Sequence, residues 1–575
     1  MNTVSYKAHK RRRRKRVAFV AAAVVIVLLL FTWIFGFGGE DLKPTISYDF
    51  MADLNAPADA VPVEQHGWPK LRDGMLSLRA AAHNRFLPSQ TFEPSDPELL
   101  HNLSIAAGEY HPVDPEVAAS DEYRPFQLDA ILNSSTYVVD VPLSPSGIRS
   151  FFLEQQATVE GMRAACALPV LGAPYDYSGV LPKDPLDRTF FYDEQAQAVL
   201  TQEPQDTSLY GQSAFNVLLP HLASLRGMSR IFTADMQLAL EAGDGARATK
   251  DLIAMLYLAR LSKQDSLLIT QLVAASIRST TLELMQEVFT DHSDLFSSED
   301  LAQIAAALVA PGTVMDPLSI NGEGIYIRDL VQRIYSDDGS GDGSLLIDSL
   351  REGGEYAGMD SFVQEVPSVI YAFARPVLKS MTLTRKEVIA MHEKQSELFD
   401  NAASQKPWEF DFSVYEQAHA QLMPSNPGAL DRIRYFPFMM LFVRYEGVFR
   451  SNYMLAALAD RIRVIVALLR YERANGMWPE SLTQLVPDYL AAVPLDPADG
   501  APLRYDVREG RPLLWSIGHD RIDNDGRSPV EFTDEVEDES LAIDNDEAAQ
   551  VKFGDLSPAL VTGDDWILWR GPRAP

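Results

Sequence analysis

The sequence predicts a mainly α-helical fold in three parts: an N-terminal single transmembrane helix, a large exported helical domain that is solenoid-like or bundled, and a small α+β C-terminal module with an antiparallel sheet. Three observations support this fold class. An uncharged stretch follows a run of bases near the N-terminus. Apolar residues recur at three- and four-residue spacing over residues 150–309, and a long amphipathic helix precedes two strand-like segments near the C-terminus.

Residues 1–16 form a basic tail and residues 17–37 form the predicted transmembrane anchor. At about 1.5 Å of rise per residue, this stretch is long enough to cross a hydrocarbon core of roughly 30 Å. Eight Lys or Arg precede it, whereas Glu40 and Asp41 follow it, so the N-terminus is expected in the cytoplasm and the bulk of the chain outside it. The alternative is a cleaved signal peptide, but residues 35–39 offer no convincing cleavage site. The predicted location is the inner (plasma) membrane, with a single pass.

The chain is strongly acidic, with 80 Asp and Glu against 50 Lys and Arg and a net charge of −30. Such a balance argues against binding nucleic acid or anionic headgroups by charge, and it favours divalent cations or basic partners. Solubility alone would also explain it. Cys166 is the one cysteine, so no intrachain disulfide can form. With 46% hydrophobic residues, the chain has ample material for a large core, and core packing must hold the fold.

Residues 38–75 are rich in Pro, Ala and Asp, which predicts a stalk or linker, or an extended wrap over the next domain. Residues 76–430 should form the mostly helical exported domain, with one strand at 136–141. Its helices are expected at residues 151–168, 214–225, 234–241, 246–261, 267–289, 301–309 and 377–402. Gly243-Asp244-Gly245 should separate two of these helices, and Ser297 with Asp300 should cap another. The Gly- and Asp-rich residues 336–344 predict a flexible loop rather than a metal site.

Residues 431–575 are expected to form a long helix followed by the α+β module. The helix covers residues 453–474, and strands are expected at 503–507 and 513–517. The apolar residues 564–569 can add a final strand. Between the second and the last of these strands, residues 531–547 carry nine acids and no base, which predicts an acidic loop.

The short sequence motifs of this module, and the order in which they occur, resemble those of the globular part of the major pseudopilin of type II secretion. The long helix ends in Asn475-Gly476 and Trp478-Pro479, a Pro494-Leu495-Asp496-Pro497 turn follows, and the second strand leads into Ser516-Ile517-Gly518-His519-Asp520. The resemblance covers about residues 457–526. Arg16 precedes Val17 without the Gly-Phe processing site of a prepilin, and more than 400 residues separate the predicted anchor from the module. The resemblance therefore implies a reused module rather than a filament subunit.

This resemblance also implies a structural calcium ion in the loop after the second strand. It carries Ser516 and Asp520 over as neighbours of such a site, and the sequence adds Asp523 and Asp525 around Asn524. Calcium takes six to eight oxygen ligands, which closely spaced carboxylates supply. The predicted calcium ligands are Ser516, Asp520, Asp523 and Asp525; a solvated acidic loop is the alternative.

No catalytic motif is apparent in the sequence. His392-Glu393 lacks the second histidine of a zinc-protease helix, and there is no Gly-x-Ser-x-Gly element. The predicted function is that of a membrane-anchored bacterial envelope protein of binding or assembly type, with a protein partner in the envelope. The alternative is a membrane-tethered extracytoplasmic hydrolase with a dispersed active site in the helical domain. A deep pocket with convergent His, Asp or Ser side chains would favour the hydrolase.

Overall fold

The computed structural model describes residues 44–86, 145–173, 175–177, 180–192, 194–202, 210–263, 267–313, 317–346, 349, 381–423, 428–439, 446–518, 521–526 and 566–572. Four predicted segments lie outside these residues: the basic tail 1–16, the anchor 17–37, the strand 136–141 and the acidic loop 531–547.

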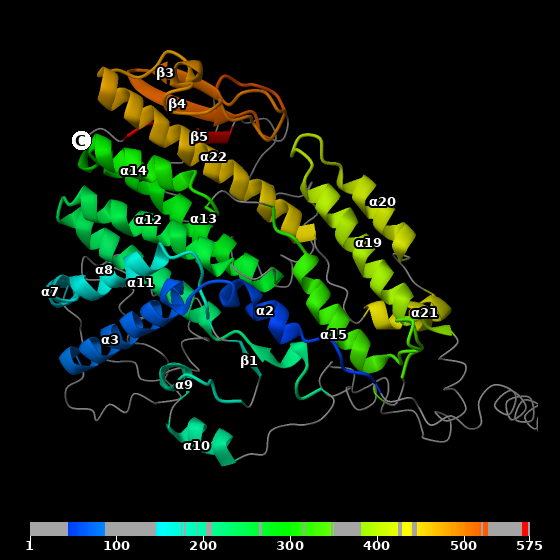
Figure 1. Cartoon of the computed structure of the whole chain (residues 1–575). Coiled ribbons are helices and arrows are strands. Elements are labelled where there is room, and N and C mark those ends of the chain that lie inside the picture. Colours follow the sequence, from blue (N-terminus) through cyan, green and yellow to red (C-terminus); the bar gives the residue numbers. More distant parts are fainter. Residues whose placement is uncertain are drawn as a thin grey trace, which may run out of the picture.

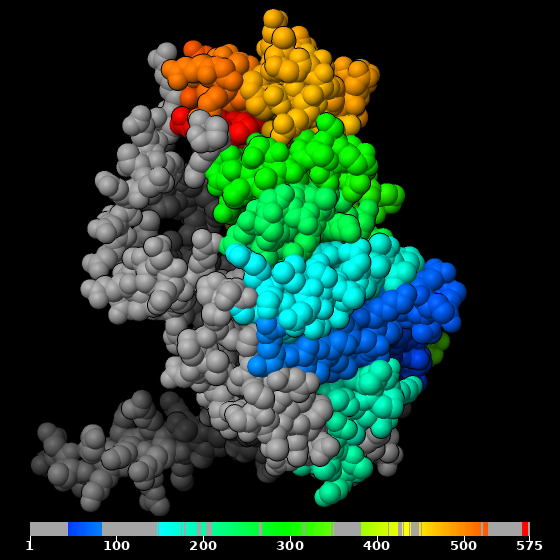
Figure 2. Space-filling view, turned by 90° about the vertical axis from the view of Figure 1, so that its left-hand side faces the viewer, coloured from blue at the N-terminus to red at the C-terminus, as the bar shows by residue number. Residues whose placement is uncertain are grey.

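The helices of the main body are stacked in layers, with α3 near one end and a small sheet at the other (Figure 1). Figure 2 shows the same order as successive bands of colour from blue to orange. Along the stack, α3 packs on α8, α8 and α11 pack on α12, α12 packs on α13 and α14, and both of these pack on α22. The helices are α3 (Trp68–Phe86), α8 (Gln156–Cys166), α11 (His221–Glu241), α12 (Gly245–Ser262), α13 (Leu268–Asp291), α14 (Ser298–Leu308) and α22 (Glu446–Asn475). The mainly helical prediction is confirmed.

A second group of helices stands beside the stack, at the right of Figure 1. It contains α15 (Gly324–Ile334), α19 (Arg385–Ala403), α20 (Phe412–Leu422) and α21 (Ala429–Met439). α19 packs on each of the other three and also on α22. Smaller elements are α2 (Phe50–Asp59), α7 (Pro145–Glu154), α9 (Pro185–Phe191), α10 (Glu194–Gln202), β1 (Asp176–Tyr177), β2 (Val217–Leu218) and 3-10 turns at Val63–Gln65, Ala214–Asn216, Ser293–Leu295, Asn321–Glu323 and Leu482–Leu485.

The predicted C-terminal sheet is confirmed as three antiparallel strands in the order β3 (Arg504–Arg508), β4 (Arg511–Ser516) and β5 (Trp566–Trp569). The strand residues Leu514 and Trp569 belong to the same buried cluster as the apolar face of α22. The Trp569 indole Nε1 also donates a hydrogen bond to Thr290 Oγ1 of α13 at 3.0 Å. The last strand therefore joins the sheet to the helical stack.

The fold class needs one correction. Within the described ranges, none of the helices is both long enough and apolar enough to cross a membrane. The long helices carry charged side chains along their length; α22 alone contains Asp460, Arg461 and Arg463 near its middle. The described fold is therefore mainly helical with a small antiparallel sheet and has no membrane-spanning helix. This finding also contradicts the prediction of a transmembrane, signal-anchored, single-pass protein.

The predicted stalk at 38–75 is helical in much of its described part. Residues of α2 and the start of α3 are buried, among them Phe50, Leu54, Trp68 and Leu71. Their apolar side chains are separated by Pro, Gly and charged residues, which hid the helical spacing in the sequence. This segment therefore packs into the body instead of extending from it.

Two predicted helix boundaries also change. The helix expected at 151–168 is interrupted at Gln155, which separates α7 from α8. The helices expected at 214–225 and 234–241 are one continuous helix, α11, which begins only after Pro220. Proline is favoured at the start of a helix because its missing N–H has no intrahelical acceptor there. By contrast, the Ser297–Asp300 capping box and the Gly243 break, at φ +73°, are present as predicted.

A buried charge network ties three helices of the stack together. Arg163 of α8 donates from Nε to Asp251 Oδ1 at 2.8 Å and from Nη2 to Asp235. Arg247 of α12 also donates to Asp235 of α11, with its Nε at 2.9 Å from Oδ2. Both aspartates have no exposed surface. Burial raises the pKa of Asp251 well above its ordinary value of 3.8, although Arg163 acts in the opposite direction.

The raised pKa of Asp251 predicts a pH dependence. A carboxyl whose pKa is higher in the folded state contributes stability below its unfolded pKa and loses it as the pH rises through the folded value. We therefore expect the stability advantage of the wild type over Asp251→Asn to shrink from pH 4 to pH 8. Thermal unfolding of both proteins across this range measures the difference. An advantage that grows with pH would mean that Asp251 is ionised in the folded state.

Candidate binding site

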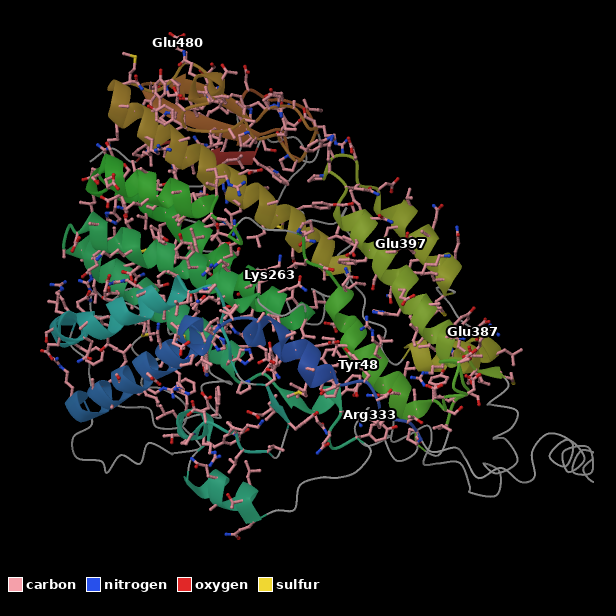
Figure 3. All side chains as sticks on the ribbon, viewed as in Figure 1. Tyr48, Lys263, Arg333, Glu387, Glu397 and Glu480 are labelled. Carbon is pink, nitrogen blue, oxygen red and sulfur yellow. The ribbon has the colours of Figure 1, made fainter. Side chains whose placement is uncertain are left out.

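A groove of about 370 Å³ lies between α15 and α19. The α19 side is formed by Ile389, His392, Glu393, Ser396, Glu397, Asp400 and Asn401. The facing wall is formed by Asn321, Gly324, Ile327 and Arg328. Figure 3 shows Glu397 on α19 and Tyr48 beside α15, just before α2 begins.

Local sequence signals place α19. Thr384 and Glu387 form a capping box at its N-terminus. The adjacent loop then fixes the direction of the helix, because Arg385 Nη1 donates to Asp337 Oδ2 at 2.7 Å and Lys386 N donates to Asp342 Oδ1 at 3.1 Å. Residues 336–344, expected as a flexible loop, thus hold a hydrogen-bonded turn against α19. The three- and four-residue spacing of the groove residues then brings them to one face of the helix.

α15 is held equally firmly by its own side chains. The Gln332 side-chain oxygen accepts hydrogen bonds from the backbone N–H groups of Ser47 and Tyr48, both at 2.8 Å. Buried Asp329 accepts from Arg333 Nε at 2.9 Å and from Ala214 N at 2.8 Å. These contacts connect two separate parts of the chain to α15, so the groove has a pre-formed wall.

His392 forms the floor of the groove. It is only 8% exposed and makes no hydrogen bond with any of the described residues. A Cβ atom at position 324 would lie 3.3 Å from His392 Nε2, so the glycine there permits the close approach of α15. Burial lowers the pKa of His392 to about 4, and the positive charge of Arg328 acts in the same direction. At neutral pH the ring is therefore uncharged, with one donor and one acceptor nitrogen.

The rim of the groove is acidic on the α19 side. Glu393 and Glu397 are exposed, stand one helical turn apart, and form no ion pair with the described part of the chain. Asp400 accepts hydrogen bonds from Asn321 Nδ2 at 2.7 Å and Ser319 Oγ at 3.2 Å. On the opposite wall, the guanidinium of Arg328 lies 5.7 Å from the centre of the Tyr48 ring.

His392, Ser396 and Asp400 converge on the groove, but they are not linked as a catalytic relay would be. Ser396 is 6% exposed, and its Oγ is shielded from solvent without a hydrogen-bond partner in the described part of the chain. A serine nucleophile needs a hydrogen bond to a general base and access to substrate. The oxygens of Asp400 bond to Asn321 and Ser319 rather than orienting the imidazole. This arrangement is suited to binding rather than to hydrolysis.

The predicted calcium residues lie elsewhere, in the C-terminal module. Buried Ser516 donates from Oγ to Asp496 Oδ1 at 2.7 Å, and Asp523 accepts from the Trp515 indole at 3.1 Å. The Asp525 backbone N–H donates to Asp523 at 3.0 Å. Asp520 lies outside the described residues.

An arginine stands at the centre of this acidic cluster. Arg504 contacts Asp496 at 2.7 Å, Asp499 at 2.6 Å and Asp523 at 3.7 Å. Over the described ranges, no group of three or more His, Cys, Asp or Glu side chains is arranged to hold a metal ion. Calcium binding by Ser516, Asp520, Asp523 and Asp525 stays a prediction.

The groove was missed in the sequence although part of its signal is visible there. His392, Ser396 and Asp400 form a polar series at four-residue spacing, and Val388 and Phe399 of the same helix belong to the buried core. A polar series beside such a core-facing stripe indicates a second helix face that is not packed in the apolar core. No local signal pairs this face with Arg328, because that contact exists only in the folded chain.

Comparison of this chain with protein-family models, with curated proteins and with solved structures gave no match. The resemblance of residues 457–526 to a pseudopilin module stays a prediction.

Proposed function

We propose that this protein is a binding protein, and that the groove between α15 and α19 holds a segment of its partner. The observation that carries the proposal is the buried imidazole of His392, which has no hydrogen-bond partner among the described residues and lies on the floor of a groove of about 370 Å³. Ligand sites in proteins typically have volumes of about 300–1,000 Å³ and combine apolar walls with a few polar groups. Ile327 and Ile389 supply such walls here.

The rigidity of both walls supports binding. Besides the contacts that hold α15, the ring of Phe399 on α19 stacks on Phe449 of α22 at 4.6 Å between centroids. A site that exists before the ligand arrives does not have to be ordered on binding, which favours affinity. The hydrolase alternative has less support, since Ser396 is neither activated nor accessible.

Site-specific photo-crosslinking in the full chain tests this function. Benzoylphenylalanine replaces Asn401, an exposed residue at the end of the groove, and in a control replaces Val414, which is 60% exposed on α20. When the cells that express the protein are irradiated, we expect a discrete cross-linked product with the probe at position 401 and none with the probe at position 414. Adding Gly324→Leu, which fills the groove beside His392, should remove that product while circular dichroism stays unchanged.

Two results would overturn the proposal. One is the same cross-linking pattern from positions 401 and 414, or none from either. The other is a product at position 401 that persists in a correctly folded Gly324→Leu protein.

A further inference from the structure

We infer that the groove recognises a cationic side chain, lysine or arginine, presented by a partner polypeptide. This inference rests on the proposed function and adds the chemical class of the bound group. Three features of the groove carry it: the acids on its rim, the buried imidazole on its floor and the basic residue on its facing wall.

The first feature is an uncompensated pair of carboxylates. Glu393 and Glu397 lie at the rim with no ion pair to the described residues, although other exposed acids nearby are paired. Glu387, on the same helix, contacts Arg434 at 3.3 Å. Like charges four residues apart on a helix repel each other. A cation placed between them would remove this repulsion and form two charge-assisted hydrogen bonds.

The second feature is the floor. His392 is 8% exposed, has no described hydrogen-bond partner and lines the groove, so its acceptor nitrogen can receive an N–H from a ligand. Being uncharged, it does not repel a cation. Ile327 and Ile389 on either side can pack on the methylene stem of lysine or arginine, whose charged end reaches the acids.

The third feature is Arg328, which gives the groove a direction. Arg328 lies on α15, seven residues after Asn321, which belongs to the 3-10 turn before this helix. Asn321 is bonded to Asp400 and Gly324 lies against His392, so Arg328 lies toward the Ile389 end of the groove. The negative charge of Glu393 and Glu397 draws a cationic side chain to the rim, and Arg328 on the facing wall is left to meet carbonyl or carboxylate oxygens of the same partner. A polypeptide offers both kinds of group, and the net charge of −30 attracts basic proteins at long range.

Fluorescence anisotropy on the full chain tests this inference. The probes are fluorescein-labelled ten-residue Gly/Ser peptides with two central residues that are lysine, arginine, acetyl-lysine or norleucine. We expect the lysine and arginine peptides to bind at least tenfold more tightly than the two uncharged ones. Glu393→Gln with Glu397→Gln should weaken their binding at least tenfold. The control, Glu416→Gln with Glu480→Gln, makes the same charge change at exposed positions away from the groove and should stay within twofold of the wild type.

The inference is overturned if lysine and norleucine peptides bind equally, if no lysine or arginine peptide binds the wild type, or if the control loses as much affinity as the groove variant. Calorimetry with spermidine and with calcium chloride tests whether the groove prefers another cation. If either one binds more tightly than the lysine and arginine peptides, and Glu393→Gln with Glu397→Gln abolishes that binding, the ligand is not a polypeptide side chain. These failures leave the proposed function intact if the cross-link at Asn401 is still removed by Gly324→Leu. Loss of that cross-linking result overturns the proposed function and the inference together.

Discussion

Replacing Arg163 with methionine should lower the free energy of opening of helices α8, α11 and α12 by about 3–5 kcal/mol. The substitution keeps most of the side-chain volume but removes the cation that joins Asp235 to Asp251. Asp235 then stays buried as a carboxylate with Arg247 alone, and the carboxyl group of Asp251, whose pKa burial already raises, loses the cation and the Nε donor beside it. Hydrogen exchange of amides in the three helices measures the opening directly, which suits a chain of this size better than a single unfolding midpoint.

Glu160→Gln is the matched control for this experiment. Glu160 also pairs with Arg163, at 2.9 Å, but its side chain is 54% exposed. An exposed ion pair contributes at most about 1 kcal/mol, so we expect little change. A loss below about 1 kcal/mol in the Arg163 variant would show that the network adds no more than a surface pair does.

Replacing Asp496 with alanine should have the second largest effect, a local loss of about 3–5 kcal/mol in the C-terminal module. The carboxylate of Asp496 has no exposed surface. It accepts from Ser516 Oγ at 2.7 Å, from Ile517 N at 3.0 Å and from Arg504 Nη1 at 2.7 Å. Two of these donors would be left buried and unpaired, which costs far more than the net value of the bonds themselves.

The neighbouring Asp499 provides the comparison. It also pairs with Arg504, at 2.6 Å, but its side chain is 27% exposed and can be replaced by water. We expect Asp499→Ala to cost about 1 kcal/mol or less. Exchange rates of the amides in β3 and β4, with those of α12 as an internal reference, separate the two variants. Equal effects would mean that Asp496 does not organise the turn between α22 and the sheet.

Signals that act within a few residues were predictable from the sequence. The Ser297–Asp300 capping box, the break at Gly243 and the strands on either side of Glu509-Gly510 each depend on contacts between near neighbours. The long helix expected at residues 453–474 was predictable because its apolar stripe repeats over many turns, although the helix begins earlier, at Glu446.

Features that depend on distant contacts were not predictable in the same way. Trp68 and Leu71 begin a core helix inside a segment that looks like a stalk, since only the folded body supplies their partners. The groove is a similar case, because Arg328 and His392 come from different helices. The anchor at 17–37 was predicted from the sequence pattern alone, and no described helix is long and apolar enough to span a membrane.

The position of β5 sets an order on synthesis. Trp569 bonds to Thr290, which lies 279 residues earlier in the chain. A ribosome adds about 5–20 residues per second, so roughly 15–55 s pass between the two residues. The helices of the stack can pack during this interval. β4 is complete 50 residues before β5 begins, so for roughly 3–10 s its edge has no β5 beside it. Until β5 arrives, that edge is open to strands of other chains, and the newly made protein is at its most vulnerable to aggregation.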